Sequence, residues 1–264
     1  MDESGFDTTS RFYVKTMDLA PPDLNAFLWG YSRDMEAIAL RLRDKAQEEG
    51  NQKDFLKYSS EGAFWGNEAK QIKHDVIKHC WDEESGMFRD YRFQGENQGL
   101  QKDEDALSAV VAPLWVGMLD PKDPKEKEMI ERSLDNISLF EKDHGLAATA
   151  EDYGHPEMQW NGPSGWAPLH MMAIESEVQF GRHDAAARHT QKWLDTIDKV
   201  HSEDGIILER YDVVKGGHPP VQKGRYEETQ GEGPGFGWTN ATVPWAMIEV
   251  VGGVRLHRDA GVPT

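Results

Sequence analysis

The sequence has a single cysteine, Cys80, among its 264 residues. One cysteine excludes an intrachain disulfide, and it also excludes metal sites that are built from several thiolates. The ten histidines include no His-x-x-x-His pair and no other compact set of ligands. We therefore expect neither a disulfide scaffold nor a zinc site.

Long apolar runs and an excess of positive charge are also missing. No apolar run approaches the roughly 18 residues that a membrane helix needs, and Met1-Asp2-Glu3-Ser4 is not the basic start of a secretory signal. The 47 acidic residues exceed the 29 basic ones, and the net charge of -18 opposes binding to nucleic acid and to anionic membranes. We expect a soluble, cytoplasmic protein that has neither partner.

Strands with alternating apolar and polar residues are absent from the pattern, whereas apolar residues recur at helical spacing in several segments. From Leu24 to Leu42 they form the stripe of an amphipathic helix that follows Pro21-Pro22 and stops by Gly50. Pro113 should kink or break a second, largely apolar helix. The further helices are predicted over a stretch that ends near residue 80 and over residues 107–118, 125–140, 168–180, 184–200 and 241–251.

The predicted helices alternate with long loops that are rich in glycine, tryptophan, proline and aspartate. Long structured loops on a rigid scaffold are where binding groups are usually found. The pattern predicts an all-α toroid whose loops gather at one mouth. Because about seven or eight helices are fewer than the twelve of a closed barrel, we expect residues 1–264 to form one domain that is truncated at its N-terminus.

Three loops combine carboxylates or amides with aromatic residues and glycine, namely residues 2–12, 159–168 and 224–240. Hydrolysis of a sugar needs this mixture, because aromatic faces cover the C–H face of a pyranose, polar groups bind its hydroxyls, and two carboxyl groups flank the scissile bond. Any single acidic residue is more often an exposed surface residue, since the chain contains 47 of them.

Five sequence blocks, spread from the first residues nearly to the last, indicate which kind of sugar hydrolase the chain resembles. The blocks are Glu3-Ser4-Gly5-Phe6-Asp7 with Ser10-Arg11-Phe12, Pro22-Asp23-Leu24-Asn25-Ala26, Trp81-Asp82-Glu83 with Phe88-Arg89-Asp90-Tyr91, Gln159-Trp160 through Trp166-Ala167-Pro168, and Gly235-Phe236-Gly237-Trp238-Thr239-Asn240. In their type and order they resemble those of the trehalases, glycoside hydrolase family 37. The resemblance implies an (α/α)6 barrel that hydrolyses trehalose to two glucose molecules with inversion, without a metal or organic cofactor.

The resemblance also implies the two catalytic groups. It makes Asp7 the general acid, and we expect burial and the neighbouring carboxylate of Glu3 to raise the pKa of Asp7 so that it stays protonated. The alternative for Asp7 is an ordinary N-cap or loop carboxylate. The general base is a glutamate shortly before residues 235–240, where we choose Glu227 and keep Glu228 and Glu232 open, and an inverting pair should stand about 6.5–9.5 Å apart.

Substrate contacts are expected mainly in the tryptophan block. Trp160 and Trp166 are equally candidates for walls of a sugar subsite and for core residues. Gln159 and Asn161 are predicted to hydrogen-bond sugar hydroxyls, and Asn161 stands where the family signature usually has an aspartate.

The first loop contributes Gly5, which would let the backbone approach the sugar, and Phe6, which stands for the usual tryptophan. Arg11 is expected to pair with a carboxylate and anchor this loop rather than touch substrate. Structural roles are expected for the three histidines in or near the loops, His155, His170 and His218.

Two other functions stay open at this point. The stretch from Thr229 to Gly233 and the change at Asn161 are compatible with a family 63 α-glucosidase or mannosylglycerate hydrolase. A carbohydrate-binding remnant without catalysis is the other alternative. Trehalases also carry a preceding half with a second signature, so we expect either self-association or a partner chain to complete the barrel.

Overall fold

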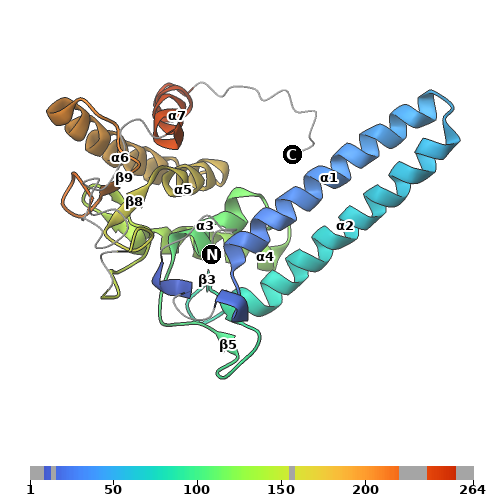
Figure 1. Ribbon diagram of the computed structural model, residues 1–264, viewed down its shortest axis with the longest axis horizontal. Coiled ribbons are helices and arrows are strands. Elements are labelled where there is room, and N and C mark those ends of the chain that lie inside the picture. Colours follow the sequence, from blue (N-terminus) through green and yellow to red (C-terminus); the bar gives the residue numbers. More distant parts are fainter. Residues whose placement is uncertain (1–8, 13–15, 155–157, 220–236, 254–264) are drawn as a thin grey trace.

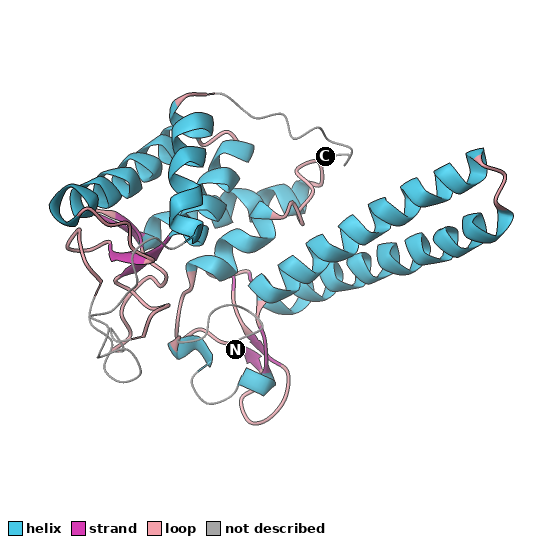
Figure 2. Ribbon diagram, turned by 45° about the horizontal axis from the view of Figure 1, so that its top comes forward, coloured by secondary structure: helices cyan, strands magenta, loops and turns pink. Residues whose placement is uncertain are grey.

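The computed structural model describes residues 9–12, 16–154, 158–219 and 237–253. Within these ranges the chain is mostly helical, and its α-helices number seven (Figures 1 and 2). They are α1 (Pro22–Glu48), α2 (Gln52–Cys80), α3 (Leu107–Trp115), α4 (Pro124–Asn136), α5 (Ala167–Gln179), α6 (His183–Asp204) and α7 (Gly237–Trp245). The expectation of an all-α architecture is therefore confirmed.

In the described part of the chain, short strands lie between the helices and form only small two- and three-stranded sheets. Each strand is two or three residues long, and the pairs are all antiparallel. They are β1 (Leu19–Ala20), β4 (Tyr91–Arg92) and β5 (Gly99–Leu100) in one sheet, then the pairs β2 (Trp81–Asp82) with β3 (Met87–Phe88), β6 (Glu141–Lys142) with β7 (Gly145–Leu146), and β8 (Ser164–Trp166) with β9 (Arg210–Asp212). Short helical turns complete the set at Ser10–Phe12, Thr16–Asp18 and Ile137–Phe140.

The helices are arranged in pairs along a row. Helix α2 packs on α1, α4 on α3 and α6 on α5, while α1, α3, α5 and α7 contact one another in that order. The two ends of this row, α1 and α7, lie apart (Figure 1). The row corresponds to part of the inner layer of an (α/α) toroid, with α2, α4 and α6 behind it.

The core lies around α3 and α5. Every residue of α3 from Leu107 to Leu114 is buried, as predicted for an apolar run that lies between neighbouring helices. Pro113 does not kink this helix in its middle, because α3 ends two residues later at Trp115. A second group of buried side chains, which includes Trp193, Val200 and Tyr211, joins α6 to β9.

Helices α1 and α2 form a long hairpin that extends away from the rest of the molecule (Figure 1). Their mutual contact is made by small buried residues, which allow the two backbones to approach closely. On α1 these are Ser32, Ala39 and Ala46, and on α2 they are Gly62, Gly66 and Ala69. A Cβ atom added at Gly62 would stand 3.1 Å from Cδ2 of Leu40.

Apolar side chains remain exposed at both ends of the row of helices. On α1, Leu28, Tyr31, Ile38 and Leu42 are 39–55% exposed although they continue one stripe of the helix. Beyond α7, the π-helical turn Ala246–Val251 exposes Met247, Ile248 and Val251. Across the described ranges, no helix combines the length and the apolar character that crossing a membrane requires.

Candidate active site

The tryptophan block forms one wall of the candidate site. The rings of Trp160 and Trp166 stack with their centroids 3.9 Å apart, and the ring of Trp238 meets both edge-on. The indole N–H of Trp166 donates to the carbonyl of Gln159 at 2.8 Å. Of the two stacked rings, Trp166 is the inner one and belongs to the core, whereas Trp160 is the outer one and lines the cavity.

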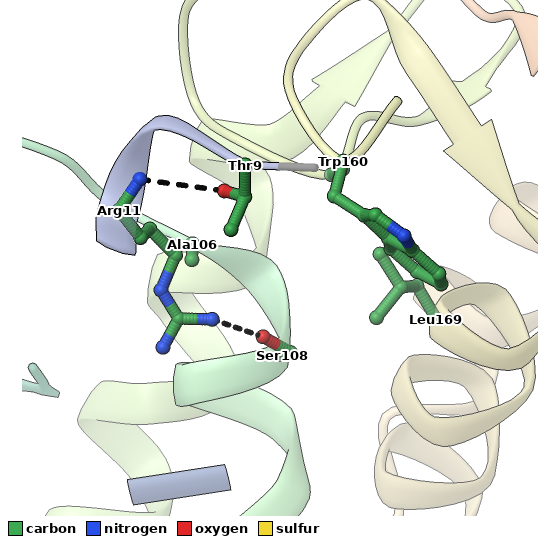
Figure 3. Close-up of a pocket in the computed structure, with 7 residues that line it drawn as sticks. Thr9, Arg11, Ala106, Ser108, Trp160 and Leu169 are labelled. Atoms are coloured by element: carbon green, nitrogen blue, oxygen red, sulfur yellow. Dashed lines mark hydrogen bonds between the residues drawn. The ribbon is translucent and has the colours of Figure 1, made fainter. Parts of the chain in front are cut away.

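A small cavity separates this wall from the first loop (Figure 3). Its volume is about 10 Å³, room for about one water molecule, and its lining is Thr9, Arg11, Ala106, Ser108, Ala148, Trp160 and Leu169. Small-molecule sites usually have volumes of about 300–1,000 Å³. The lining residues thus enclose less space than such a site usually offers.

The side chain of Asn161 binds the first loop, a structural role that we did not predict. Its side chain is fully buried, and its Oδ1 accepts hydrogen bonds from the backbone N–H of Ser10 at 3.1 Å and from Oγ1 of Thr9 at 3.3 Å. Its Nδ2 donates to Oγ of Ser10 at 2.7 Å. Because both ends of the amide bind the first loop, Asn161 holds this loop in place, and its contact with a sugar hydroxyl stays a prediction.

Arg11 anchors the other side of the same loop. Its guanidinium donates two parallel hydrogen bonds to the carboxylate of Asp90, at 3.0 and 2.7 Å. Its Nη1 donates to Asp23 at 2.7 Å and to Oγ of Ser108 at 2.9 Å. The expectation that Arg11 pairs with a carboxylate is confirmed, and the structure adds that two carboxylates share it.

The three charged groups of this cluster are all buried, and together they carry one excess negative charge. Burial by itself lowers the pKa of Arg11, but the charges of Asp23 and Asp90 outweigh it and raise that pKa. Burial also raises the pKa of Asp90, and Asp23 adds to this against the opposing effect of Arg11. Burial, Asp90 and Asp23 raise the pKa of the nearby Cys80 thiol to about 12, so Cys80 stays protonated.

His170 supports the tryptophan block from α5. Its Nδ1–H donates to the carbonyl of Trp166 at 2.8 Å, and its Nε2 accepts from the backbone N–H of Leu146 at 2.8 Å. Burial lowers its pKa to about 3, so the ring is neutral. His170 is the structural histidine that we predicted, and His218 likewise pairs with Asp204 at the surface.

The remaining candidates lie outside the described residues. They are Glu3, Gly5, Phe6, Asp7, His155, Glu227, Glu228 and Glu232. Their roles stay predictions, as does the separation between acid and base. Within the ranges that are described, no three His, Cys, Asp or Glu residues are grouped as a metal ion would require.

The family model that matches this chain describes trehalases, and two relatives that match it are trehalases. A model of the trehalase family matches residues 1–251. The cytosolic neutral trehalase of Neurospora crassa is 30% identical over an alignment 269 residues long, which covers 93% of this chain and 34% of that protein. The cytosolic neutral trehalase of Saccharomyces cerevisiae is 31% identical over an alignment 253 residues long, which covers 91% of this chain and 32% of that protein. The chain therefore spans about a third of the length of the curated relatives that it matches.

Solved structures with a similar fold include a trehalase and a family 63 hydrolase. The neutral trehalase of Saccharomyces cerevisiae superposes with a TM-score of 0.67 at 29% identity, over 92% of this chain and 40% of that one. A family 63 mannosylglycerate hydrolase from Thermus thermophilus gives a TM-score of 0.57 at 16% identity, over 86% and 44% of the two chains. The second likeness shows the shared fold alone.

We predict that Arg11→Met lowers the free energy of unfolding by about 3–5 kcal/mol, because it leaves the buried carboxylates of Asp23 and Asp90 without a counterion. Urea unfolding followed by circular dichroism measures this loss. Arg43→Met is the matched control, because Arg43 pairs with Asp44 at the surface, where such a pair contributes at most about 1 kcal/mol. Equal losses in the two variants would contradict the role of the cluster.

We predict that His170 makes the protein sensitive to acid. Its pKa is about 3 in the folded chain and near 6.5 in an unfolded one, so only the unfolded chain takes up this proton as the pH falls between these values. Stability should then fall by up to roughly 1.4 kcal/mol per pH unit in that window, and be unaffected above it.

His170→Gln tests this prediction, because glutamine keeps one donor and one acceptor but does not titrate. Unfolding measured from pH 7 to pH 4 should show a shallower decline for this variant by about one proton. His218→Gln makes the same substitution at an exposed histidine and serves as the control. Identical slopes for parent and His170→Gln would show that the ring is not held neutral.

Proposed function

The chain belongs to the trehalase family, and on that premise we propose that it hydrolyses the α,α-1,1 bond of trehalose to two glucose molecules. The observation that most supports a sugar site is that the first loop and the tryptophan block lie side by side around the small cavity. Two sequence blocks that are about 150 residues apart meet there through Asn161. An aromatic ring, Trp160, faces buried polar groups across it, which is the chemical character of a carbohydrate site.

In the proposed reaction Asp7 is the general acid and Glu227 the general base, with Glu228 and Glu232 as the other candidates for the base. Asp7 gives its proton to the glycosidic oxygen as the bond from this oxygen to the anomeric carbon breaks. A water molecule attacks that carbon from the opposite face and gives a proton to the glutamate. The product therefore forms with inverted configuration.

The residues that bind the sugar are also part of the proposal. Trp160 would cover one face of a pyranose ring, while Gly5 would let the first loop approach the sugar and Gln159 would bind a hydroxyl. Trp166 acts behind Trp160, since it is buried beneath that ring. The names of the curated relatives, cytosolic neutral trehalases, support a cytoplasmic location.

We further propose that the exposed face of α1 is covered in the active protein by a second copy or by a partner polypeptide. The hairpin Pro22–Cys80 carries nine basic and ten acidic residues, whereas the whole chain has a net charge of -18. Contact through the hairpin would therefore escape most of the repulsion between two acidic chains. The exposed stripe Leu28, Tyr31, Ile38 and Leu42 supplies the apolar surface.

The first test of function is release of glucose from trehalose, with the anomers followed by NMR. An inverting reaction gives equal initial amounts of α- and β-glucose. Asp7→Asn should abolish this release while the fold persists, because it removes the proton donor but little volume. Asp198→Asn, at an exposed position of α6, is the control and should retain the rate.

Each other outcome points to a different function. An unchanged rate in Asp7→Asn would remove Asp7 from the mechanism. Glucose released only from other α-glucosides or from mannosylglycerate would favour a family 63 type of activity, and sugar binding without turnover would favour a binding remnant. Glu227→Gln, Glu228→Gln and Glu232→Gln, measured separately, identify the base as the variant whose rate is lost.

The test of association is the mass of the chain by size-exclusion chromatography with light scattering. If two copies meet through α1, the parent chain has twice its monomer mass, and Tyr31→Glu with Ile38→Glu returns it to the monomer mass because two buried charges are introduced. Met17→Glu, at an exposed residue outside the hairpin, should leave the mass unchanged. A monomer that is fully active would refute the proposal.

A further inference from the structure

Three side chains form a continuous line of hydrogen bonds beside the cavity. Nδ2 of Asn161 donates to Oγ of Ser10 at 2.7 Å, and Oγ of Ser10 donates in turn to Oε2 of Glu104. The line joins the tryptophan block to the first loop and then to the segment that enters α3. Asn161 and Ser10 are buried, and Glu104 is half-buried.

The direction of each hydrogen bond in this line is fixed by chemistry. The backbone N–H of Ser10 can only donate, so the Asn161 atom that faces it must be the oxygen, Oδ1. The amide nitrogen must then face the hydroxyl of Ser10 and donate to it. Since that hydroxyl has one proton, the proton goes to the carboxylate of Glu104.

This line holds the first loop from the side that is opposite Arg11. Thr9 also donates to Asn161, so two successive residues of the loop are bound to one buried amide. Arg11 binds Asp23 and Asp90 on the other side. Asp7 precedes Thr9 by two residues, a length of chain that spans at most about 7 Å, so fixing Thr9 restricts where Asp7 can lie.

We propose that Asn161 and Glu104 are positioning residues, which act through Ser10 to set the place of the first loop and thereby of its general acid. This rests on the proposed function of Asp7. Neither residue needs to touch substrate. We expect the two residues to affect kcat, because a displacement of about 1 Å in a reacting group can slow the chemical step about a hundredfold.

The hydrogen-bonding groups of the two end residues are complementary, because the amide of Asn161 donates to Ser10 and the carboxylate of Glu104 accepts from it. An aspartate at position 161 would place two carboxylates on one hydroxyl, and only one of them could receive its proton. A glutamine at position 104 would correct this, because its amide N–H could donate to Ser10 while Ser10 donates to the new aspartate. The line would then run in the opposite direction with the same number of hydrogen bonds.

The experiment compares the parent chain with Asn161→Asp, Glu104→Gln and the double variant. For trehalose hydrolysis we expect kcat of Asn161→Asp to fall by about 10- to 100-fold with KM little changed, and the double variant to recover most of that loss. Hydrogen exchange at the backbone amides of residues 9–12 should accelerate in Asn161→Asp and slow again in the double variant. Ser10→Ala, which removes the link with little change of volume, should reproduce the effects of Asn161→Asp.

Asn136→Asp is the matched control, because the amide of Asn136 donates to the carbonyls of Ser85 and Gly86 away from the cavity. It should lower the melting temperature without changing kcat. A fall of kcat in proportion to stability in both variants would overturn the proposal, and so would a double variant that is no better than Asn161→Asp.

The hydrogen-exchange measurement separates this proposal from the proposed function. A parent chain that does not cleave trehalose would refute that function, and the line of hydrogen bonds would still be supported by exchange that is faster in Asn161→Asp and restored in the double variant. An active parent chain whose exchange at residues 9–12 is the same in all variants would refute the positioning role alone.

Discussion

The guanidinium of Arg11, shared between the buried carboxylates of Asp23 and Asp90, is the interaction on which the candidate site depends. A buried charge is tolerated only when it is paired and hydrogen-bonded, so each group requires the others to be in place. Asp23 belongs to the first turn of α1, and Asp90 precedes β4. Through Ser108 the same cluster reaches α3. One arginine thus ties the first loop to three separate parts of the fold.

The opposite wall is held in a different way, by hydrogen bonds between neutral groups of the protein. Trp166 donates to Gln159, and His170 both donates to Trp166 and accepts from Leu146. The stacked ring of Trp160 therefore rests on a fixed support and has little freedom to turn. Asn161 connects this wall to the loop that Arg11 holds. The cavity between them consequently has two walls whose separation is set by hydrogen bonds.

The row of helices explains why these loops lie together. Helices α1, α3, α5 and α7 lie side by side, and each is followed by a connection of its own. The first loop precedes α1, Glu104 precedes α3, and the tryptophan block precedes α5, so all three enter the same layer of helices at the same kind of position. The exposed apolar residues at the ends of the row follow from this arrangement, since among the described residues an open row leaves one side of each terminal helix uncovered.

The sequence by itself determined the helical class, because apolar periodicity is a local property. The predicted helices at 168–180 and 184–200 correspond to Ala167–Gln179 and His183–Asp204. The order of its blocks also determined the family. Only the tertiary structure decided that Asn161 holds the first loop and that Arg11 has two carboxylate partners. These contacts join residues that are 151 and 79 positions apart. The type of a residue indicates that its polar group needs a partner when it is buried. It does not indicate which distant residue supplies that partner.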